Sequence, residues 1–141
     1  RSEWDLLRKS AVNFIDAVPV EKYRALAEEC LALGCGVVVL KSGHRGMYAR
    51  TANAQRIARI SALAAGAPDW ADRELWGAAY HNDAIQSAAG AGDTAVAGIL
   101  TAMLRGKTLE QTLQFGNCLG YQNLRALDTV SGVGTLASAH A

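Results

Sequence analysis

The sequence has few of the residues that cross-link a chain or bind metals, with only three cysteines and three histidines among 141 residues. The cysteines form an odd set without Cys-x-x-Cys spacing, which argues against a disulfide framework and a zinc site. The histidines are scattered, so no metal site is expected among them. A reducing cytoplasm is the simplest expectation for such a chain. The residues concerned are Cys30, Cys35, Cys118, His44, His81 and His140.

A surplus of charge of either sign is also missing, since the formal net charge is +1. Nothing electrostatic therefore favours a nucleic acid or an acidic membrane surface as partner. Trp4, Trp70 and Trp76 lack a surrounding basic patch, so we expect core or half-buried anchors rather than platforms for stacking bases. The longest apolar runs are too short to span a bilayer, and no secretory signal is visible.

What the chain does contain is an ordered series of strand-like and helix-like segments, in a length that suits one domain. Apolar residues at helical spacing from Pro19 predict a helix that Gly34 ends: Val20, Tyr23, Ala27, Cys30 and Leu31. A continuous β-branched run at 36–40 predicts a strand buried on both faces. Further strands are expected at 47–50 and 74–80, with a weak one at 56–60. Between them we expect a polar loop at 51–56 and a turn at Pro68 and Asp69.

Two helices are predicted in the second half of the chain. Thr108 and Gln111 form a capping box for a helix to about Asn123. The preceding helix ends at Gly106. Strands followed by helices imply a layered α/β fold. The apolar stripe expected to face the core of the earlier helix consists of Val96, Ile99, Leu100, Met103 and Leu104.

The turn formed by Gly90, Ala91, Gly92 and Asp93 opens this helix and is the strongest candidate for chemistry. Free backbone N–H groups and the positive end of the helix dipole favour an anion there, and glycine allows a phosphate to approach closely. Asp93 is then an acid or base beside that phosphate. The alternative is an ordinary acidic residue at a helix N-terminus, which contributes only ~0.3–1 kcal/mol of stability.

Three segments in order resemble the ribokinase-like (PfkB-type) carbohydrate kinases. They are the Gly-Ala-Gly-Asp turn at 90–93 with Gly98, the strand and Gly-x-x-Gly turn at 36–46, and Phe-Gly-Asn-Cys-Leu-Gly at 115–120. The resemblance runs from about residue 19 to about residue 133. It implies a three-layer αβα ribokinase-like fold, of which residues 1–141 are a single α/β domain, the C-terminal nucleotide-binding half. Family members are typically about twice as long, and the half expected to be absent carries most sugar contacts.

The resemblance implies an ATP-dependent kinase that moves the γ-phosphoryl group of Mg·ATP to a sugar hydroxyl. Asp93 would be the catalytic base, and the backbone of Gly90, Ala91 and Gly92 would form the anion hole. Sugar and ATP are then the expected partners, without nucleic acid or membrane, and a homodimer stays open. Two alternatives remain: a non-catalytic nucleotide-binding module of the same fold, and a structural α/β domain whose glycines serve only turns.

The resemblance also assigns Lys41, Ser42, Gly43 and Gly46 to the edge of the nucleotide, against the alternative of a plain hairpin turn. His44 and Arg45 are expected to be solvated. Asn117 would lie near the adenine base, although an asparagine bonded to backbone is an equal alternative. Gly116 and Gly120 lie on one helix face. Either they let a nucleotide or a neighbouring helix come close, or they simply cost helix propensity.

This sequence departs from the family pattern where many members hold a monovalent cation. Ser87, Ala88 and Ala89 stand where the family writes Asp-Thr-x, so a potassium site is doubtful and we expect weak or no dependence on potassium. The family's magnesium-organising Asn-x-x-Glu motif is expected upstream of residue 36. The segment from Asn13 to Asp16 has a similar shape but lies closer to the strand than expected.

Overall fold

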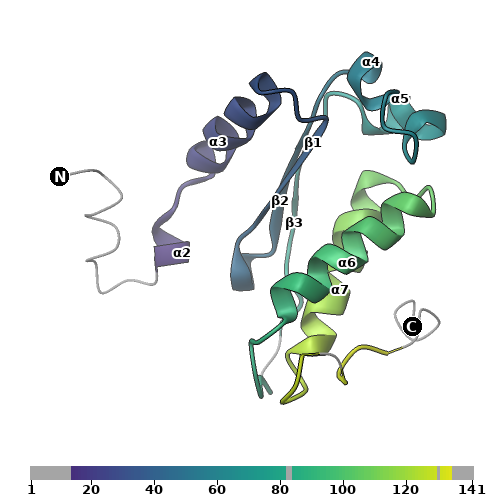
Figure 1. The fold of residues 1–141 in the computed structure, drawn as a ribbon. Coiled ribbons are helices and arrows are strands. Elements are labelled where there is room, and N and C mark those ends of the chain that lie inside the picture. The colour runs from purple at the N-terminus through teal and green to yellow at the C-terminus, as the bar shows by residue number, and fades with distance from the viewer. Residues whose placement is uncertain (1–13, 82–83, 130, 135–141) are drawn as a thin grey trace.

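The sheet of the protein lies between two layers of helix in the computed structural model, which describes residues 14–81, 84–129 and 131–134. Figure 1 shows helix α3 (Val20–Ala32) on one side of strands β1 (Val37–Lys41), β2 (Met47–Thr51) and β3 (Glu74–Gly77). Helices α6 (Ala91–Leu104) and α7 (Leu109–Asn123) lie on the other side. This arrangement is the three-layer α/β fold that the sequence predicts.

The three strands are antiparallel in the order β1-β2-β3, with Val39 opposite Ala49 and Ala49 opposite Leu75. Because side chains alternate along a strand, each strand contributes to two cores. Val37, Val39, Met47, Ala49 and Leu75 pack in the cluster that includes Ala95 and Ile99 of α6. Val38, Leu40, Tyr48 and Trp76 pack in a second cluster with α3.

Helix α3 confirms the apolar face predicted from its spacing. Its five sheet-facing residues are the predicted ones: Val20, Tyr23, Ala27, Cys30 and Leu31. Pro19 is the N-cap rather than the first helical residue. Strand β1 is less buried than predicted: only Val38 is buried, because within the described residues β1 pairs with β2 alone.

Short helical segments replace some of the expected loop and strand structure. They are α2 (Phe14–Ala17), η1 (Gly43–Arg45), α4 (Ala54–Ile57), η2 (Ala64–Gly66) and α5 (Ala67–Trp70). The predicted strand at 56–60 is wrong, because Asn53 caps α4 by accepting a 3.0 Å hydrogen bond from Arg56 N. The loop at 51–56 is wrong in part for the same reason. Pro68 and Asp69 lie inside α5.

The predicted apolar stripe of α6 is also corrected. Val96, Leu100 and Leu104 are 40%, 53% and 76% exposed, whereas Ile99 is buried. Around Ile99, the face that packs on α7 consists of the small residues Ala95, Gly98 and Ala102, and a Cβ on Gly98 would lie 3.1 Å from Gly116 Cα. The hydrophobic spacing indicated the helix but not its buried side, because the close approach of α7 leaves little room for large side chains.

The ends of α6 and α7 lie close to the positions that the sequence predicts. Gly90 is the N-cap of α6 in the left-handed conformation (φ 77°). Thr108 and Gln111 form the predicted capping box of α7, with N–H···O distances of 3.3 Å and 3.2 Å. Helix α7 ends at Asn123 as expected. No helix in the described ranges has the length and apolar character that crossing a membrane requires.

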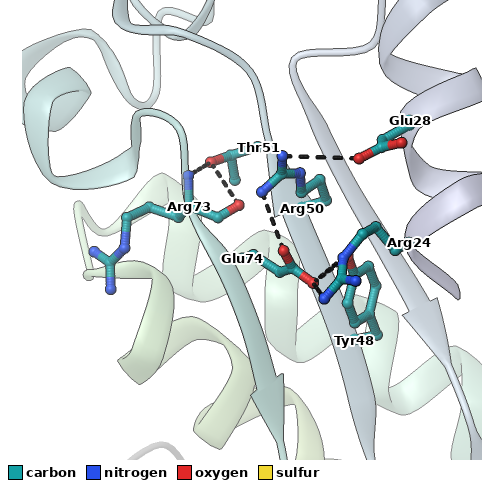
Figure 2. A network of polar contacts seen from close by, with 7 residues as sticks. All are labelled: Arg24, Glu28, Tyr48, Arg50, Thr51, Arg73 and Glu74. Atoms are coloured by element: carbon teal, nitrogen blue, oxygen red, sulfur yellow. Dashed lines mark hydrogen bonds and ion pairs between the residues drawn. The ribbon is translucent and has the colours of Figure 1, made fainter. Parts of the chain in front are cut away.

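Polar side chains of β2 and β3 form a network with α3 (Figure 2). Arg24 Nε and Tyr48 Oη donate to Glu74 Oε1 at 2.9 Å and 3.1 Å, and Arg50 Nη1 lies 3.3 Å from Glu74 Oε2. The hydrogen bond from Arg24 is the largest cause that lowers the pKa of the Glu74 carboxyl. Burial, followed by the hydrogen bond to Glu74, raises the pKa of Tyr48. This network fixes the sheet against α3.

Candidate functional site

The N-terminus of α6 presents backbone donors and a carboxylate that have no partners in the described part of the chain. The N–H groups of Gly92 and Asp93 have no hydrogen-bond acceptor among the described residues, and the Asp93 side chain is exposed. A Cβ on Gly90 would lie 2.7 Å from Thr129 Cβ, so both its positive φ and its neighbour require glycine. The turn therefore has the donors and the space that an anion needs.

Lys41 brings a positive charge to this turn from the end of β1. Its Nζ donates a 2.9 Å hydrogen bond to the carbonyl oxygen of Gly92. The two residues are 51 positions apart in the chain. The structure thus places one residue of the predicted nucleotide edge beside the predicted anion hole, and no carboxylate pairs with Lys41 in the described part of the chain.

Ser42 and Gly43, the next two residues, face elsewhere. Ser42 is 3% exposed, and its Oγ lies 2.5 Å from Tyr23 Oη of α3. A Cβ on Gly43 would lie 3.1 Å from Ile15 Cδ1. Ser42 therefore faces α3, and Gly43 lies against α2.

Gly46 closes the same turn against the end of β3. Its φ is 95°, and a Cβ would lie 2.1 Å from the carbonyl oxygen of Gly77. No other residue fits without moving the backbone of β3. Gly46 thus sets the position of the segment that follows β3.

Arg45 is not the solvated residue that the sequence suggested. Its Nη1 donates to the carbonyl oxygens of Ile15 and Val18 at 2.9 Å and 2.7 Å. Its Cζ lies 4.8 Å from the centre of the Trp76 ring. Arg45 is a packing residue, and sequence reasoning missed it because all its partners are far away in the chain.

His44, by contrast, lies at the surface, where Nε2 is 2.6 Å from Asp16 Oδ1. Asp16 belongs to the segment that resembles the magnesium motif, and Asn13 lies outside the described residues. In the parts of the chain that the structure describes, no three His, Cys, Asp or Glu side chains gather as metal ligands would.

A groove of about 380 Å³ lies between the end of β3 and α7. Its walls are largely apolar, with three polar side chains from α7. A volume of this order and a largely apolar lining with a few polar groups are typical of small-molecule sites. Sequence reasoning missed the wall at 78–80, since that stretch was expected to continue the strand. The lining residues are Leu75, Trp76, Gly77, Ala78, Ala79, Tyr80, Glu110, Leu113, Gln114 and Asn117.

Asn117 lines the groove and also holds one of its walls. Its Nδ2 donates to the carbonyl oxygens of Gly77 and Ala78 at 3.0 Å and 3.1 Å. Asn117 is therefore hydrogen-bonded to backbone, as one of the two alternatives from the sequence expected, and it also lines the groove. Gly77 connects the parts of the site, since Gly46 and Asn117 both contact it.

Gly116 and Gly120 face α6. A Cβ on Gly116 would lie 2.7 Å from Ile99 Cγ1, and one on Gly120 would lie 3.3 Å from the carbonyl oxygen of Ala91. Of the alternatives raised by the sequence, the structure shows the close approach of a helix. Gly120 thereby brings α7 against the first turn of α6, where the anion hole is predicted.

Comparison with known proteins identifies the family and the fold of the chain. The chain matches the profile of the pfkB family of carbohydrate kinases over residues 1–134, and it belongs to that family. No curated protein sequence matches it. Among solved structures, ribokinase from Thermotoga maritima is similar, with a TM-score of 0.64 and 20% sequence identity over 87% of this chain. At that identity the likeness concerns the fold, and the chain covers 34% of the ribokinase.

Proposed function

We propose that this chain is the nucleotide-binding part of an ATP-dependent carbohydrate kinase. The observation that carries the proposal is the hydrogen bond from Lys41 Nζ to the Gly92 carbonyl. It joins a cation to a helix N-terminus with free N–H groups, and phosphoryl transfer depends mainly on positioning and on neutralising charge. Family membership supports the carbohydrate kinase class.

In this proposal each group at the turn has a distinct task. Mg·ATP supplies the phosphoryl group and the metal charge that polarises it. The N–H groups of Gly92 and Asp93 donate to phosphoryl oxygens, and Lys41 turns from the Gly92 carbonyl towards a phosphate. The Asp93 carboxylate accepts the proton of the sugar hydroxyl as that oxygen attacks.

The groove beside Asn117 is proposed to receive the adenine ring. Its apolar walls at Trp76–Tyr80 and Leu113 offer contact area, while Gln114 and Asn117 provide polar atoms at the ring edge. We assign no residue of this chain to Mg²⁺ or to a monovalent cation. Because Ser87 and Ala89 replace the residues with which many family members hold a monovalent cation, activity is proposed to depend little on potassium.

The replacement of Asp93 tests this function. In the intact protein, Asp93→Asn is expected to lower sugar phosphorylation by ~10²–10⁴ because it removes the base. ATP affinity is expected to remain close to wild type. The measurements are coupled ADP release with a panel of sugars and calorimetric titration with ATP. Wild-type kcat in the variant would contradict the assignment.

A non-catalytic nucleotide-binding module is the second candidate, favoured by Ser87, Ala88 and Ala89 in place of Asp-Thr-x. Such a module binds ATP but shows no sugar-dependent turnover in any variant. A purely structural domain binds neither ATP nor ADP. Titration and turnover together therefore separate the three possibilities.

A further inference from the structure

Asn123, the last residue of α7, is a fully buried polar side chain beside the predicted anion hole. Its exposed fraction is 0%. Its Nδ2 donates a 2.8 Å hydrogen bond to the carbonyl oxygen of Ala89, the residue immediately before Gly90. The bond connects residues 34 positions apart, so it depends on the fold and not on local turn geometry.

The backbone shortly before Ala89 is hydrogen-bonded to the residue that follows Asn123. The N–H groups of Gln86 and Ser87 donate to the carbonyl of Leu124 at 2.9 Å and 3.4 Å. These contacts hold the approach to the turn, but they do not reach the peptide between Ala89 and Gly90. That peptide is oriented by the Asn123 amide.

Asn123 makes this contact at a cost in hydrogen bonding. Its Oδ1 is buried and has no hydrogen-bond partner among the described residues. An apolar side chain would remove this unsatisfied acceptor but would leave the Ala89 carbonyl without its donor. The amide is therefore explained by the position of its donor, which holds the Ala89 carbonyl.

We propose that Asn123 is a positioning residue that sets the direction of the anion-binding N–H groups; this rests on the proposed function of the 90–93 turn. By holding the Ala89 carbonyl, Asn123 fixes the peptide plane that enters Gly90. Gly90 then turns with φ 77° and starts α6, so the same plane determines where the N–H groups of Gly92 and Asp93 point. Asn123 itself does not touch the nucleotide.

The experiment compares Asn123→Leu, which keeps the branched arrangement of heavy atoms but removes the donor, with Thr112→Val. Thr112 is a matched control, since it is 1% exposed on the same helix and its Oγ1 has no described partner. Amide NMR spectra of the ligand-free 141-residue chain report the turn, and titration with ADP reports binding. A melting curve reports the fold of each variant.

In Asn123→Leu we expect displaced resonances for Gly90, Gly92 and Asp93, and ADP binding weakened roughly tenfold. Thr112→Val should change neither. Wild-type resonances and affinity in folded Asn123→Leu would overturn the proposal. Unfolding of both Asn123→Leu and Asn123→Ala would also overturn it, because Asn123 would then serve general stability.

Failure of the proposed function gives a different result. If the wild-type chain binds no ADP, the nucleotide site is wrong. The ligand-free spectra still decide whether Asn123 orients the turn. A turn that is unchanged in ligand-free Asn123→Leu refutes the positioning role whatever the nucleotide does.

Discussion

Lys41 and Glu74 show how differently two charged residues of one sheet are used. The Glu74 carboxylate accepts hydrogen bonds from Arg24, Arg50 and Tyr48, so its charge is compensated within the fold (Figure 2). The Lys41 ammonium contacts only a carbonyl oxygen within the described residues. A cation bound to a neutral acceptor retains most of its attraction for an anion, which is why Lys41 is the better candidate for a ligand contact.

Lys41→Met is expected to weaken ADP binding roughly tenfold, since a charge-assisted contact to phosphate is lost. Binding of adenosine, which carries no phosphate, should hardly change in the same variant. Calorimetric titration of both ligands gives the comparison, with Lys107→Met as a control for net charge. An equal loss for adenosine and ADP would place Lys41 away from the phosphates.

The protein is expected to lose stability in acid through Glu74. Because the pKa of the Glu74 carboxyl is lowered in the folded state, its contribution to the free energy of unfolding is present above the pKa of the unfolded chain. This contribution is lost as the pH falls through the pKa of the folded protein. Glu74→Gln should therefore lower the free energy of unfolding near neutral pH and make its decline in acid less steep. Urea unfolding between neutral and acidic pH measures both.

The control is Glu29→Gln, an exposed carboxylate on the same helix as Arg24 with no ion pair among the described residues. Glu29→Gln should leave the decline of the unfolding free energy in acid unchanged. A Glu74→Gln profile that overlays the wild-type profile would show that the network contributes nothing to stability.

At the scale of elements, the contact between α6 and α7 positions both halves of the site. α6 carries the proposed anion hole at its first turn, and α7 carries Asn117 and Asn123. Glycines at the contact let the backbones approach, so a movement of one helix is transmitted to the other. The site is therefore sensitive to residues that touch no ligand.

Gly116→Ala tests this contact. The added Cβ would lie 2.7 Å from Ile99 Cγ1 and 3.1 Å from the Ala95 carbonyl oxygen, so the helices must separate. We expect a loss of ~1–3 kcal/mol in unfolding free energy together with weaker ADP binding. Gly66→Ala is the control, because its Cβ would meet only Trp70 Cδ1 at 3.9 Å. Stability equal to wild type would show that the contact has room to spare.

The chain as a whole covers only 34% of the ribokinase to which it is similar. It has a three-stranded sheet within the described residues, and one flank of α6 exposes Val96, Leu100 and Leu104. Two core clusters nevertheless cover both faces of the sheet. We expect such a chain to fold and bind nucleotide without completing a sugar site.

The isolated 141-residue chain is accordingly expected to melt cooperatively but to show no sugar-dependent ATP turnover. The acceptor must be held in line with the phosphoryl group, and poor placement alone costs orders of magnitude in rate. The assay is ADP release with a panel of hexoses and pentoses. Turnover that requires a sugar and is lost in Asp93→Ala would show that the chain contains its own sugar site.

Local patterns determined the main helices, the hairpin and the turn before α6. The capping box at Thr108, the spacing in α3 and the glycines at 90 and 106 act within a few residues, so their effect is visible in the sequence. The same locality explains the error at 56–60, where the β-branched residues Ile57 and Ile60 favour a strand by type but have the spacing of a helical turn.

Tertiary structure alone decided which of these elements meet. Nothing local to Lys41 indicates Gly92, and nothing local to Asn123 indicates Ala89, because each pair is joined by the packing of separate layers. The buried side of α6 was decided in the same way, by the distance at which α7 packs. The sequence by itself determined the residue types that a phosphate site needs, and the fold decided which of them lie within reach of one another.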